Sequence, residues 1–456
     1  MALEDILARQ REFFSTHATK DLAFRKRQLT ALRTAILRHE EDVCEALRED
    51  LGKCAFESFV SELAFSLSET EHALGNLDAW ARPEKVGTPP ALLPAESSIV
   101  PEPYGVSLIL APWNYPFSLT IAPLVGAIAA GNCAVVKPSE LAPHTSRAIA
   151  ELIGESFDPA YIAAVEGGAD VAQELLAMRW DKLFYTGGSR VGKVVMKAAA
   201  EHLTPVTLEL GGKSPCIIHE DADIAKTAKR VMWGKCFNAG QTCVAPDYLL
   251  VQESIVEELL PALKSAVREF YSANPQQSPD YGRIVNDAHF ERIASLLKGE
   301  KVLAGGRMDA AERYIEPTIV SGKDSKLMQD EIFGPVLPLL TYATLDDAIA
   351  FVNRRDKPLS LYVFSRSAAV QERVIAETSS GGVCVNDTLV QYNNTALPFG
   401  GVGPSGLGAY HGKASFDAFS HRKSVMNRSL IENEMRYPPY QDKVLALLKR
   451  FRKLLG

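Results

Sequence analysis

The segment VSLILAP (106–112) begins a series of four short apolar segments, each closed by Gly or Pro; the others are NCAVVKP (132–138), YIAAVEG (161–167) and KLFYTGG (182–188). Stretches with apolar residues at helical spacing separate them, for example HTSRAIAELIGESF (144–157). Strands that alternate with helices are typical of a parallel sheet with helices on both faces. This part of the chain therefore predicts a doubly wound α/β domain.

The same alternation resumes further along the chain. It starts near Pro205 and includes VTLELGG (206–212), PCIIHE (215–220), YVFS (362–365) and GGVCVN (381–386). Upstream, residues 1–80 have helical periodicity, whereas six prolines between 83 and 103 favour an extended connection. We therefore expect an α/β protein with two doubly wound domains in series and a boundary near residue 210.

Composition sets the broad class of protein. The chain has 456 residues, of which 46% are hydrophobic and 23% charged, close to the average for soluble globular proteins. Its 49 Lys and Arg against 56 Asp and Glu give a formal net charge of −7, which offers no overall basic surface for nucleic acid. The seven cysteines form no CxxC pair or Cys/His cluster. We expect reduced thiols in the cytoplasm, no metal and no nucleic-acid partner.

The sequence shows no sign of a secretory signal or a membrane span. The N-terminal residues MALEDILARQREFF (1–14) lack the apolar core of a signal peptide. The most apolar stretch, 119–136, is interrupted by Thr120, Pro123 and Asn132, and it is short for a span of about 20 residues. This stretch predicts a buried helix that leads into a strand.

One segment matches the GxGxxG pattern of dinucleotide-binding proteins, at GVGPSG (401–406). That motif requires a strand directly before it and a helix that begins within it, because the pyrophosphate lies at the helix N-terminus. Here TALPFG (395–400) precedes the pattern, and Pro404 and Gly408 oppose a helix. We therefore interpret it as a structural glycine loop.

Two other segments are better candidates for a cofactor site. A predicted strand ends at Lys137, with Glu140 just beyond it, and ligands of open α/β sheets bind beyond the carboxyl ends of strands. A lysine and a carboxylate suit ribose hydroxyls. In the second segment, the turn 186–189 precedes a helix expected to begin near Val191, where free N–H groups and a hydroxyl can hold a phosphate. Each segment alone is equally typical of caps and turns.

FNAGQTC (237–243) contains the candidate nucleophile, Cys243. Gly240, Gln241 and Thr242 directly before it form a tight polar segment, which predicts an accessible thiol surrounded by N–H donors. Such surroundings favour the thiolate. The other six cysteines are expected to be small buried hydrophobes. Glu209 lies in an apolar strand that leads into a Gly-Gly turn, where burial would raise its pKa toward that of a general base. An ion pair between Glu209 and Lys213 is an alternative of equal weight.

Together these motifs resemble the NAD(P)-dependent aldehyde dehydrogenase superfamily. The resemblance rests first on LELGGKSP (208–215) and FNAGQTC (237–243), in which Cys243 lies 34 residues after Glu209. It rests also on PWNYPF (112–117), VVKPSE (135–140), EIFGP (331–335) and PFGG (398–401). CVAPDY (243–248), RYPPY (436–440) and the short N-terminus are similar to the class 3 branch, which acts on fatty and aromatic aldehydes.

The resemblance implies a role for each catalytic residue. Cys243 would attack the aldehyde carbon to form a thiohemiacetal, and oxidation would leave a thioester. The side-chain amide of Asn114 and the backbone N–H of Cys243 would hold the oxyanion, and Glu209 would activate the hydrolytic water. The resemblance also implies contacts to the cofactor. Lys137 and Glu140 would contact the adenosine ribose, and the turn Gly187, Gly188 and Ser189 would contact the phosphates. Glu331 would contact the nicotinamide ribose, and Phe333 would pack beside the nicotinamide ring.

The resemblance also bears on cofactor and substrate. Many relatives have Ser at the position of Gly188, so the hydroxyl contact at this turn departs from the family pattern. The charge of Glu140 disfavours a 2′-phosphate, which predicts NAD, with NADP possible. Tyr115 would line the substrate tunnel, and Leu119, Trp233 and Phe399 would add apolar walls. Medium- or long-chain, aromatic and apolar unsaturated aldehydes are the expected substrates.

We expect four regions along the chain. They are a cofactor-binding domain (1–80 and 104–210), a catalytic domain (211–395), a bridging element that pairs subunits of a homodimer (81–103 and 396–440) and a C-terminal tail (441–456). The tail, QDKVLALLKRFRKLLG, has apolar residues at helical spacing among five Lys and Arg. Such a helix lies on an anionic membrane or packs on the protein itself.

Two rival functions remain open. A CoA-acylating aldehyde dehydrogenase would release the thioester to CoA, but such relatives typically lack the glutamate at the position of Glu209. A non-catalytic binding protein on the same fold would have no need of Cys243, Glu209 and Asn114 together.

Overall fold

The computed structural model describes residues 2–431 and 436–455. Contacts divide the chain into two compact units. The larger contains the residues up to Trp80 and Glu102–His421, and the smaller contains Ala81–Pro101 and the residues from Arg422 onward. The larger unit carries two mainly parallel sheets with flanking helices, which confirms the predicted fold class.

The first sheet has six strands in the order β17-β7-β6-β3-β4-β5. Its strands are parallel except for β17, which pairs antiparallel with β7. Their bounds are β3 (Val106–Leu110), β4 (Cys133–Lys137), β5 (Ile162–Ala164), β6 (Lys182–Gly187), β7 (Val206–Leu210) and β17 (Gly406–Leu407).

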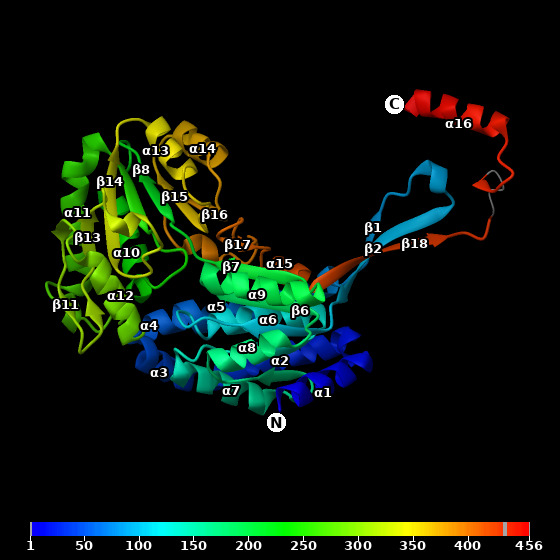
Figure 1. Cartoon of the computed structure of the whole chain (residues 1–456), viewed down its shortest axis with the longest axis horizontal. Helices are drawn as coiled ribbons and strands as arrows, with labels where there is room; N and C mark the ends of the chain where they lie inside the picture. Colours follow the sequence, from blue (N-terminus) through cyan, green and yellow to red (C-terminus); the bar gives the residue numbers. More distant parts are fainter. Residues whose placement is uncertain (1, 432–435, 456) are drawn as a thin grey trace. The chain divides into compact units, whose positions relative to one another are not determined.

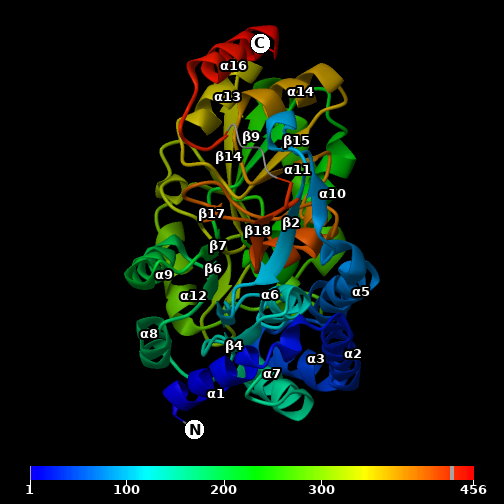
Figure 2. The same cartoon turned by 90° about the vertical axis from the view of Figure 1, so that its right-hand side faces the viewer.

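The helices of this part include the one expected within 119–136. Every residue of α6 (Ser118–Ala130) is buried, and the helix ends at Gly131, which has a left-handed backbone. The other helices are α1 (Leu3–Ser15), α2 (Leu22–Arg38), α3 (Glu40–Leu51), α4 (Ala55–Ser58), α5 (Ala64–Trp80), α7 (Pro143–Ser156), α8 (Ala169–Ala177), α9 (Ser189–His202) and α15 (Gly412–Ala418). Figure 2 shows α1, α2 and α3 gathered around α7 near the N-terminus.

The second sheet has seven strands in the order β10-β13-β14-β9-β8-β15-β16. Their bounds are β8 (Pro215–Ile218), β9 (Tyr248–Gln252), β10 (Val302–Ala304), β13 (Thr318–Ser321), β14 (Val336–Tyr342), β15 (Ser360–Phe364) and β16 (Gly382–Val385). A short pair of strands, β11 (Met308–Asp309) and β12 (Tyr314–Ile315), forms a separate ribbon.

Alternating side chains bury both faces of this second sheet. Cys216 and Ile218 join a core with α10, α11 and α12, whereas Ile217 between them joins a core with α13 and α14. Figure 1 shows the two groups of helices on opposite sides of the sheet. The helices are α10 (Ile224–Cys236), α11 (Val256–Tyr271), α12 (Asp287–Leu297), α13 (Leu345–Asn353) and α14 (Ala368–Glu377).

The glycine-rich segment 401–406 is a tight loop at the edge of the first sheet. Gly406 of β17 lies opposite Glu209 of β7. A Cβ at Gly401 would lie 2.0 Å from the carbonyl oxygen of Ser405, so the loop admits no side chain there. Residues 396–421 belong to the larger unit, which differs from their expected place in a bridging element, because β17 and α15 pack on β7 and α6.

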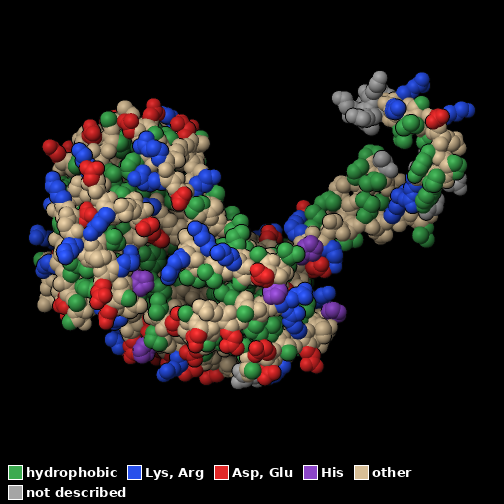
Figure 3. Space-filling view, in the orientation of Figure 1, with side chains coloured by type: hydrophobic (Ala, Val, Ile, Leu, Met, Phe, Trp, Pro, Cys, Tyr) green, Lys and Arg blue, Asp and Glu red, His purple; other side chains and the backbone are tan. Residues whose placement is uncertain are grey.

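The smaller unit, here called the arm, contains a three-stranded sheet in the order β1-β2-β18. Its elements are β1 (Glu84–Val86), β2 (Ala95–Pro103), β18 (Ser420–Arg428) and a C-terminal helix, α16 (Asp442–Leu455). An ion pair joins Arg422 to Glu84 across this sheet. Apolar side chains are exposed along the arm, among them those of Leu93, Val425, Met426 and Leu430 (Figure 3).

Candidate active site

Cys243 follows a turn whose backbone is almost entirely left-handed. After α10 ends, Asn238, Ala239 and Gly240 have φ values of 50°, 51° and 74°. Non-glycine residues adopt this conformation at a cost, so surrounding contacts must hold it. Gly240 is required by space as well as by φ, since a Cβ there would lie 2.4 Å from the carbonyl oxygen of Gly334.

The fully buried side chain of Gln241 supplies some of these contacts. Its Nε2 donates to the carbonyl oxygens of Asn238 at 3.1 Å and Arg283 at 2.9 Å, and its Oε1 accepts from the N–H of Val285 at 3.0 Å. The side-chain amide of Gln241 thereby links the turn to the segment 283–285, which precedes α12. The position of the thiol is consequently set by buried hydrogen bonds.

The thiol of Cys243 lies where two cavities meet. One, of about 200 Å³, is lined mainly by apolar and aromatic side chains from α4, α6 and α10 and from the segment 389–393. The other, of about 210 Å³, is lined by polar residues and glycines at the carboxyl ends of the first sheet's strands. Cys243 is a lining residue of both, so a molecule in either cavity can reach its sulfur.

Electrostatics keep this thiol protonated. Burial and the neighbouring carboxylate of Glu209 raise the pKa of Cys243 well above its usual range. The expectation that the turn favours the thiolate is therefore wrong in this state, because burial of the thiol, together with the negative charge of Glu209, outweighs the nearby N–H donors. Cys243 needs a base to become a nucleophile.

Glu209 has the properties of such a base. Its side chain is 2% exposed, and burial raises its pKa to about 7, although interactions with Cys243 and Thr186 partly oppose the shift. Within the described part of the chain its Oε1 has no hydrogen-bond partner. The alternative ion pair with Lys213 is wrong, because Lys213 pairs with Asp247 instead.

Asn114 lies on the loop between β3 and α6, beside the nucleophile's turn. Its Nδ2 donates to the carbonyl oxygen of Gln241 at 3.0 Å, and its own carbonyl oxygen accepts from Asn238 Nδ2 at 2.8 Å. An amide nitrogen carries two N–H groups, so one remains to donate to a bound oxygen. Next to it, the hydroxyl of Tyr115 contacts Thr242 Oγ1 at 2.6 Å.

The predicted cofactor residues gather at the carboxyl ends of β4 and β6. Lys137 Nζ lies 2.9 Å from Glu140 Oε2 at the end of β4. Gly188 is the N-cap of α9, which begins at Ser189 rather than near Val191. Ser189 Oγ donates to the carbonyl oxygen of Pro404 at 3.3 Å. At this turn the first backbone N–H groups of α9 are the phosphate donors that best fit a dinucleotide.

Glu331 and Phe333 line the polar cavity together with Gly187 and Gly188. Burial and the charge of Asp247 raise the pKa of Glu331 to about 8. A Cβ at Gly211 would lie 2.1 Å from Glu331 Oε2, so glycine makes room for that carboxylate. These carboxylate, aromatic and glycine positions fit the ribose and ring of a nicotinamide dinucleotide.

Some predictions about the cavities need correction, and some residues were missed. Tyr115, Leu119 and Trp233 line the apolar cavity, but Phe399 does not; its ring packs behind Tyr392 at 4.9 Å between centroids. The polar cavity also has lining residues that were not predicted, among them Trp113, His289 and Arg292. Trp113 adjoins Asn114 in PWNYPF and was detectable there, whereas His289 and Arg292 lie on α12, where nothing in the sequence marks them.

Comparisons with known proteins show the family of this chain. The profile of the aldehyde dehydrogenase family matches residues 2–425. The 4,4'-diaponeurosporen-aldehyde dehydrogenase of Staphylococcus aureus is 52% identical over 94% of this chain and 95% of its own length. Aldehyde dehydrogenase family 3 member B1 of Rattus norvegicus is 49% identical over 98% of this chain and 97% of its own.

A solved structure is similar in fold as well. The substrate-bound state of Staphylococcus aureus AldH has a TM-score of 0.96 and 50% sequence identity, and the match covers 99% of this chain and 100% of that one. The chain belongs to the aldehyde dehydrogenase family. It is an enzyme that oxidises aldehydes with NAD or NADP, and its relatives are consistent with the class 3 branch.

The electrostatic link between Glu209 and Cys243 gives a first prediction. Glu209→Gln removes a negative charge beside the thiol and so lowers the pKa of Cys243. At pH 8, without cofactor, iodoacetamide is expected to alkylate Cys243 about 3- to 10-fold faster in this variant, because a tenfold change in thiolate corresponds to one pKa unit. Mass spectrometry of the Cys243 peptide measures the rate.

Glu151→Gln, an exposed substitution on α7, serves as the control and is expected to leave the rate unchanged. Equal or slower alkylation in Glu209→Gln would contradict the assigned electrostatics.

Proposed function

We propose that this enzyme oxidises medium- and long-chain, aromatic and apolar unsaturated aldehydes to carboxylic acids through a thioester on Cys243. The observation that carries this proposal is the position of the Cys243 thiol between an apolar and a polar cavity. The first cavity suits the body of an apolar aldehyde, and the second suits a dinucleotide.

The first half of the reaction forms a bond to sulfur. Glu209 accepts the thiol proton, and the sulfur of Cys243 attacks the aldehyde carbon. The carbonyl oxygen becomes an oxyanion held by the free N–H of the Asn114 amide and the backbone N–H of Cys243. Each such donor is worth about 3 kcal/mol in the transition state. When bound, NAD(P) supplies the hydride acceptor that converts the adduct to a thioester.

The second half hydrolyses the thioester. After Glu209 has released its first proton to solvent, its carboxylate takes a proton from a water molecule, which then attacks the thioester carbon. The same donors hold the new oxyanion, and its collapse breaks the carbon–sulfur bond and releases the carboxylic acid. Because the pKa of Glu209 is about 7, this half is expected to accelerate as the pH rises through 7.

The walls of the apolar cavity support the substrate class. No charged side chain is among its lining residues in the described chain. Its apolar and aromatic walls are formed by Phe56, Val60, Leu119, Trp233, Phe237 and Leu389. A substrate with a carboxylate at its far end would find no counter-charge there. The name of the Staphylococcus aureus relative, which specifies a diaponeurosporen aldehyde, supports apolar unsaturated substrates.

An aldehyde panel with Glu209→Gln tests the assignment of residues. The wild-type enzyme is expected to reduce NAD with hexanal and benzaldehyde without CoA. Glu209→Gln lowers the pKa of Cys243, so the thiol of this variant can lose its proton to solvent and still form the thioester. The variant is therefore expected to give a burst of one NADH per active site, followed by turnover slowed about 10²- to 10⁴-fold, because hydrolysis lacks its base. Stopped-flow absorbance measures NADH formation during the burst and in the steady state.

Cys243→Ala is the control and is expected to give no burst. A CoA requirement for wild-type turnover would contradict the hydrolytic function, and full steady-state turnover by Glu209→Gln would contradict the role of Glu209.

Cofactor preference depends on Glu140 in this proposal. Its exposed carboxylate lies at the end of β4, where we propose that the adenosine ribose binds. A 2′-phosphate there would meet a like charge. Glu140→Gln is expected to raise kcat/KM for NADP relative to NAD by about 5- to 50-fold, the equivalent of about 1 to 2 kcal/mol. Steady-state kinetics with both cofactors measure the ratio, and an unchanged ratio would overturn the idea.

Two further proposals concern the arm. We propose that it pairs two subunits in a homodimer, because its sheet exposes Val425 and Met426 and the segment before β2 exposes Leu93. We also propose that α16 lies on anionic membranes. Leu445, Leu447 and Leu448 are exposed beside Lys449 and Arg450, while the side chains of 451–455 lie outside the described part. Across residues 2–431 and 436–455, no helix has the length and apolarity that a membrane crossing demands.

Comparison of the full chain with a chain that ends at Tyr440 separates these two proposals. Both are expected to sediment as dimers, because the arm's sheet is intact in each. Only the full chain is expected to pellet with vesicles that contain anionic lipid. Equal pelleting would reject the membrane contact, and monomeric sedimentation of the full chain would reject the dimer.

A further inference from the structure

A fully buried ion pair lies beneath the active-site loops, outside the residues assigned above. Lys53 Nζ is 2.7 Å from Glu62 Oε1, and neither side chain has any exposed surface. Lys53 follows α3, and Glu62 belongs to a short π-helical segment (Phe59–Leu63) between α4 and α5. Such π-helical segments are frequent at functional sites.

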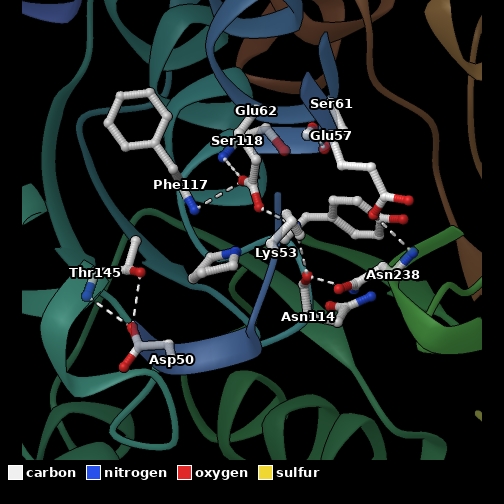
Figure 4. A network of polar contacts seen from close by, with 12 residues as sticks. Asp50, Lys53, Glu57, Ser61, Glu62, Asn114, Phe117, Ser118, Thr145 and Asn238 are labelled. Carbon is white, nitrogen blue, oxygen red and sulfur yellow. Dashed lines mark hydrogen bonds and ion pairs between the residues drawn. The ribbon is translucent and has the colours of Figure 1, made fainter. Parts of the chain in front are cut away.

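Both members of the pair contact the loop that carries Asn114 (Figure 4). Lys53 Nζ donates to the carbonyl oxygen of Asn114 at 3.4 Å and lies 4.2 Å from the centre of the Tyr115 ring. Glu62 Oε2 accepts from the N–H groups of Phe117 at 3.1 Å and Ser118 at 2.8 Å. These last two donors open α6, where a carboxylate is favoured by the helix dipole.

The neighbouring helix α4 contacts the turn of the nucleophile. Glu57 Oε2 accepts from the N–H of Asn238 at 3.0 Å, and Asn238 Nδ2 donates in turn to the carbonyl oxygens of Asn114 at 2.8 Å and Gln241 at 3.2 Å. The carbonyl oxygen of Asn114 therefore receives donors from both sides. This atom joins the two loops, in addition to the contacts of Asn114 Nδ2 with Gln241 and of Tyr115 with Thr242.

A buried ion pair is expensive and contributes little to stability on average. Its retention next to two catalytic loops calls for another explanation. The contacts of Lys53 fix the backbone on which the Asn114 amide depends, and an error of about 1 Å in such a group costs roughly 100-fold in rate.

We propose that Lys53, held by Glu62, is a positioning residue that fixes Asn114 as the oxyanion donor. This inference rests on the proposed role of Asn114. The ammonium group does not touch the reacting atoms; it orients the peptide group of Asn114 and supports the ring of Tyr115.

A double-mutant cycle with Asn114→Ala tests this role. Lys53→Met is expected to lower kcat/KM for hexanal by about 10- to 100-fold while leaving the dissociation constant for NAD unchanged. In the Asn114→Ala background the same substitution is expected to add less than about threefold, because the group that it positions is gone.

Lys182→Met provides a matched control. Lys182 is also a buried lysine near a tyrosine ring, 5.9 Å from the centre of Tyr104, but it donates to Thr207 and lies at the start of β6, away from the cavities. Its substitution is expected to change kcat/KM by less than about twofold, the usual effect of a change outside the site.

Lys53→Met leaves Glu62 as an uncompensated buried charge and can prevent folding. The pair Lys53→Met with Glu62→Gln removes both charges and keeps an oxygen for the N–H groups of Phe117 and Ser118. This double variant is expected to fold, as judged by thermal unfolding and NAD binding, and to retain the loss in kcat/KM.

Each outcome bears on a definite statement. If Asn114→Ala leaves kcat/KM unchanged, the proposed role of Asn114 fails. If Asn114→Ala lowers kcat/KM but the neutral pair is as active as wild type, only the inference about Lys53 fails. An equal loss from Lys53→Met in both backgrounds would also overturn it, because Lys53 would then act independently of Asn114.

Discussion

The active site depends on a strained turn held in place by buried polar contacts. Asn238, Ala239 and Gly240 adopt left-handed backbone conformations one after another, and the thiol of Cys243 follows directly. The turn persists because Gln241 and Glu57 satisfy its backbone groups from two directions. Without these contacts the strained backbone would relax, and the thiol would leave the junction of the two cavities.

The charges around the thiol form a second constraint. The carboxylates of Glu209 and Glu331 both help to raise the pKa of Cys243, and both have raised pKa values themselves because they are buried. The resting site therefore holds a protonated thiol next to a base whose pKa burial raises to about 7. A thiol that stays protonated until an aldehyde is bound is protected from unproductive reactions.

The sequence predicted the parts of the molecule that depend on local pattern. Apolar segments that end at Gly or Pro predicted two doubly wound sheets, and the structure contains both. The stretch 119–136 predicted a buried helix that leads into a strand, and α6 and β4 lie there. The same reasoning singled out Cys243 and Glu209, and the family resemblance added Asn114; the structure brings all three to adjoining cavities. Their roles, the cofactor contacts and the functional names of the domains stay predictions.

Features that depend on distant partners were missed or wrongly predicted. Lys213 pairs with Asp247 rather than Glu209, because β9 brings Asp247 beside it. The thiolate prediction failed because burial of the thiol and the charge of Glu209, which β7 supplies, both depend on distant parts of the chain. Lys53 and Glu62 lie in an ordinary helical pattern of mixed polar and apolar residues, and no signal in one sequence reveals that both are buried.

The central claim is that the sulfur of Cys243 carries the acyl group while Asn114 holds its oxygen. A crystal structure of Glu209→Gln, frozen after reaction with NAD and hexanal, tests this claim most directly. It is expected to show a thioester on Cys243 whose carbonyl oxygen lies about 3 Å from Asn114 Nδ2. A free thiol with the acyl group on another residue, or a thioester oxygen directed away from Asn114, would contradict it.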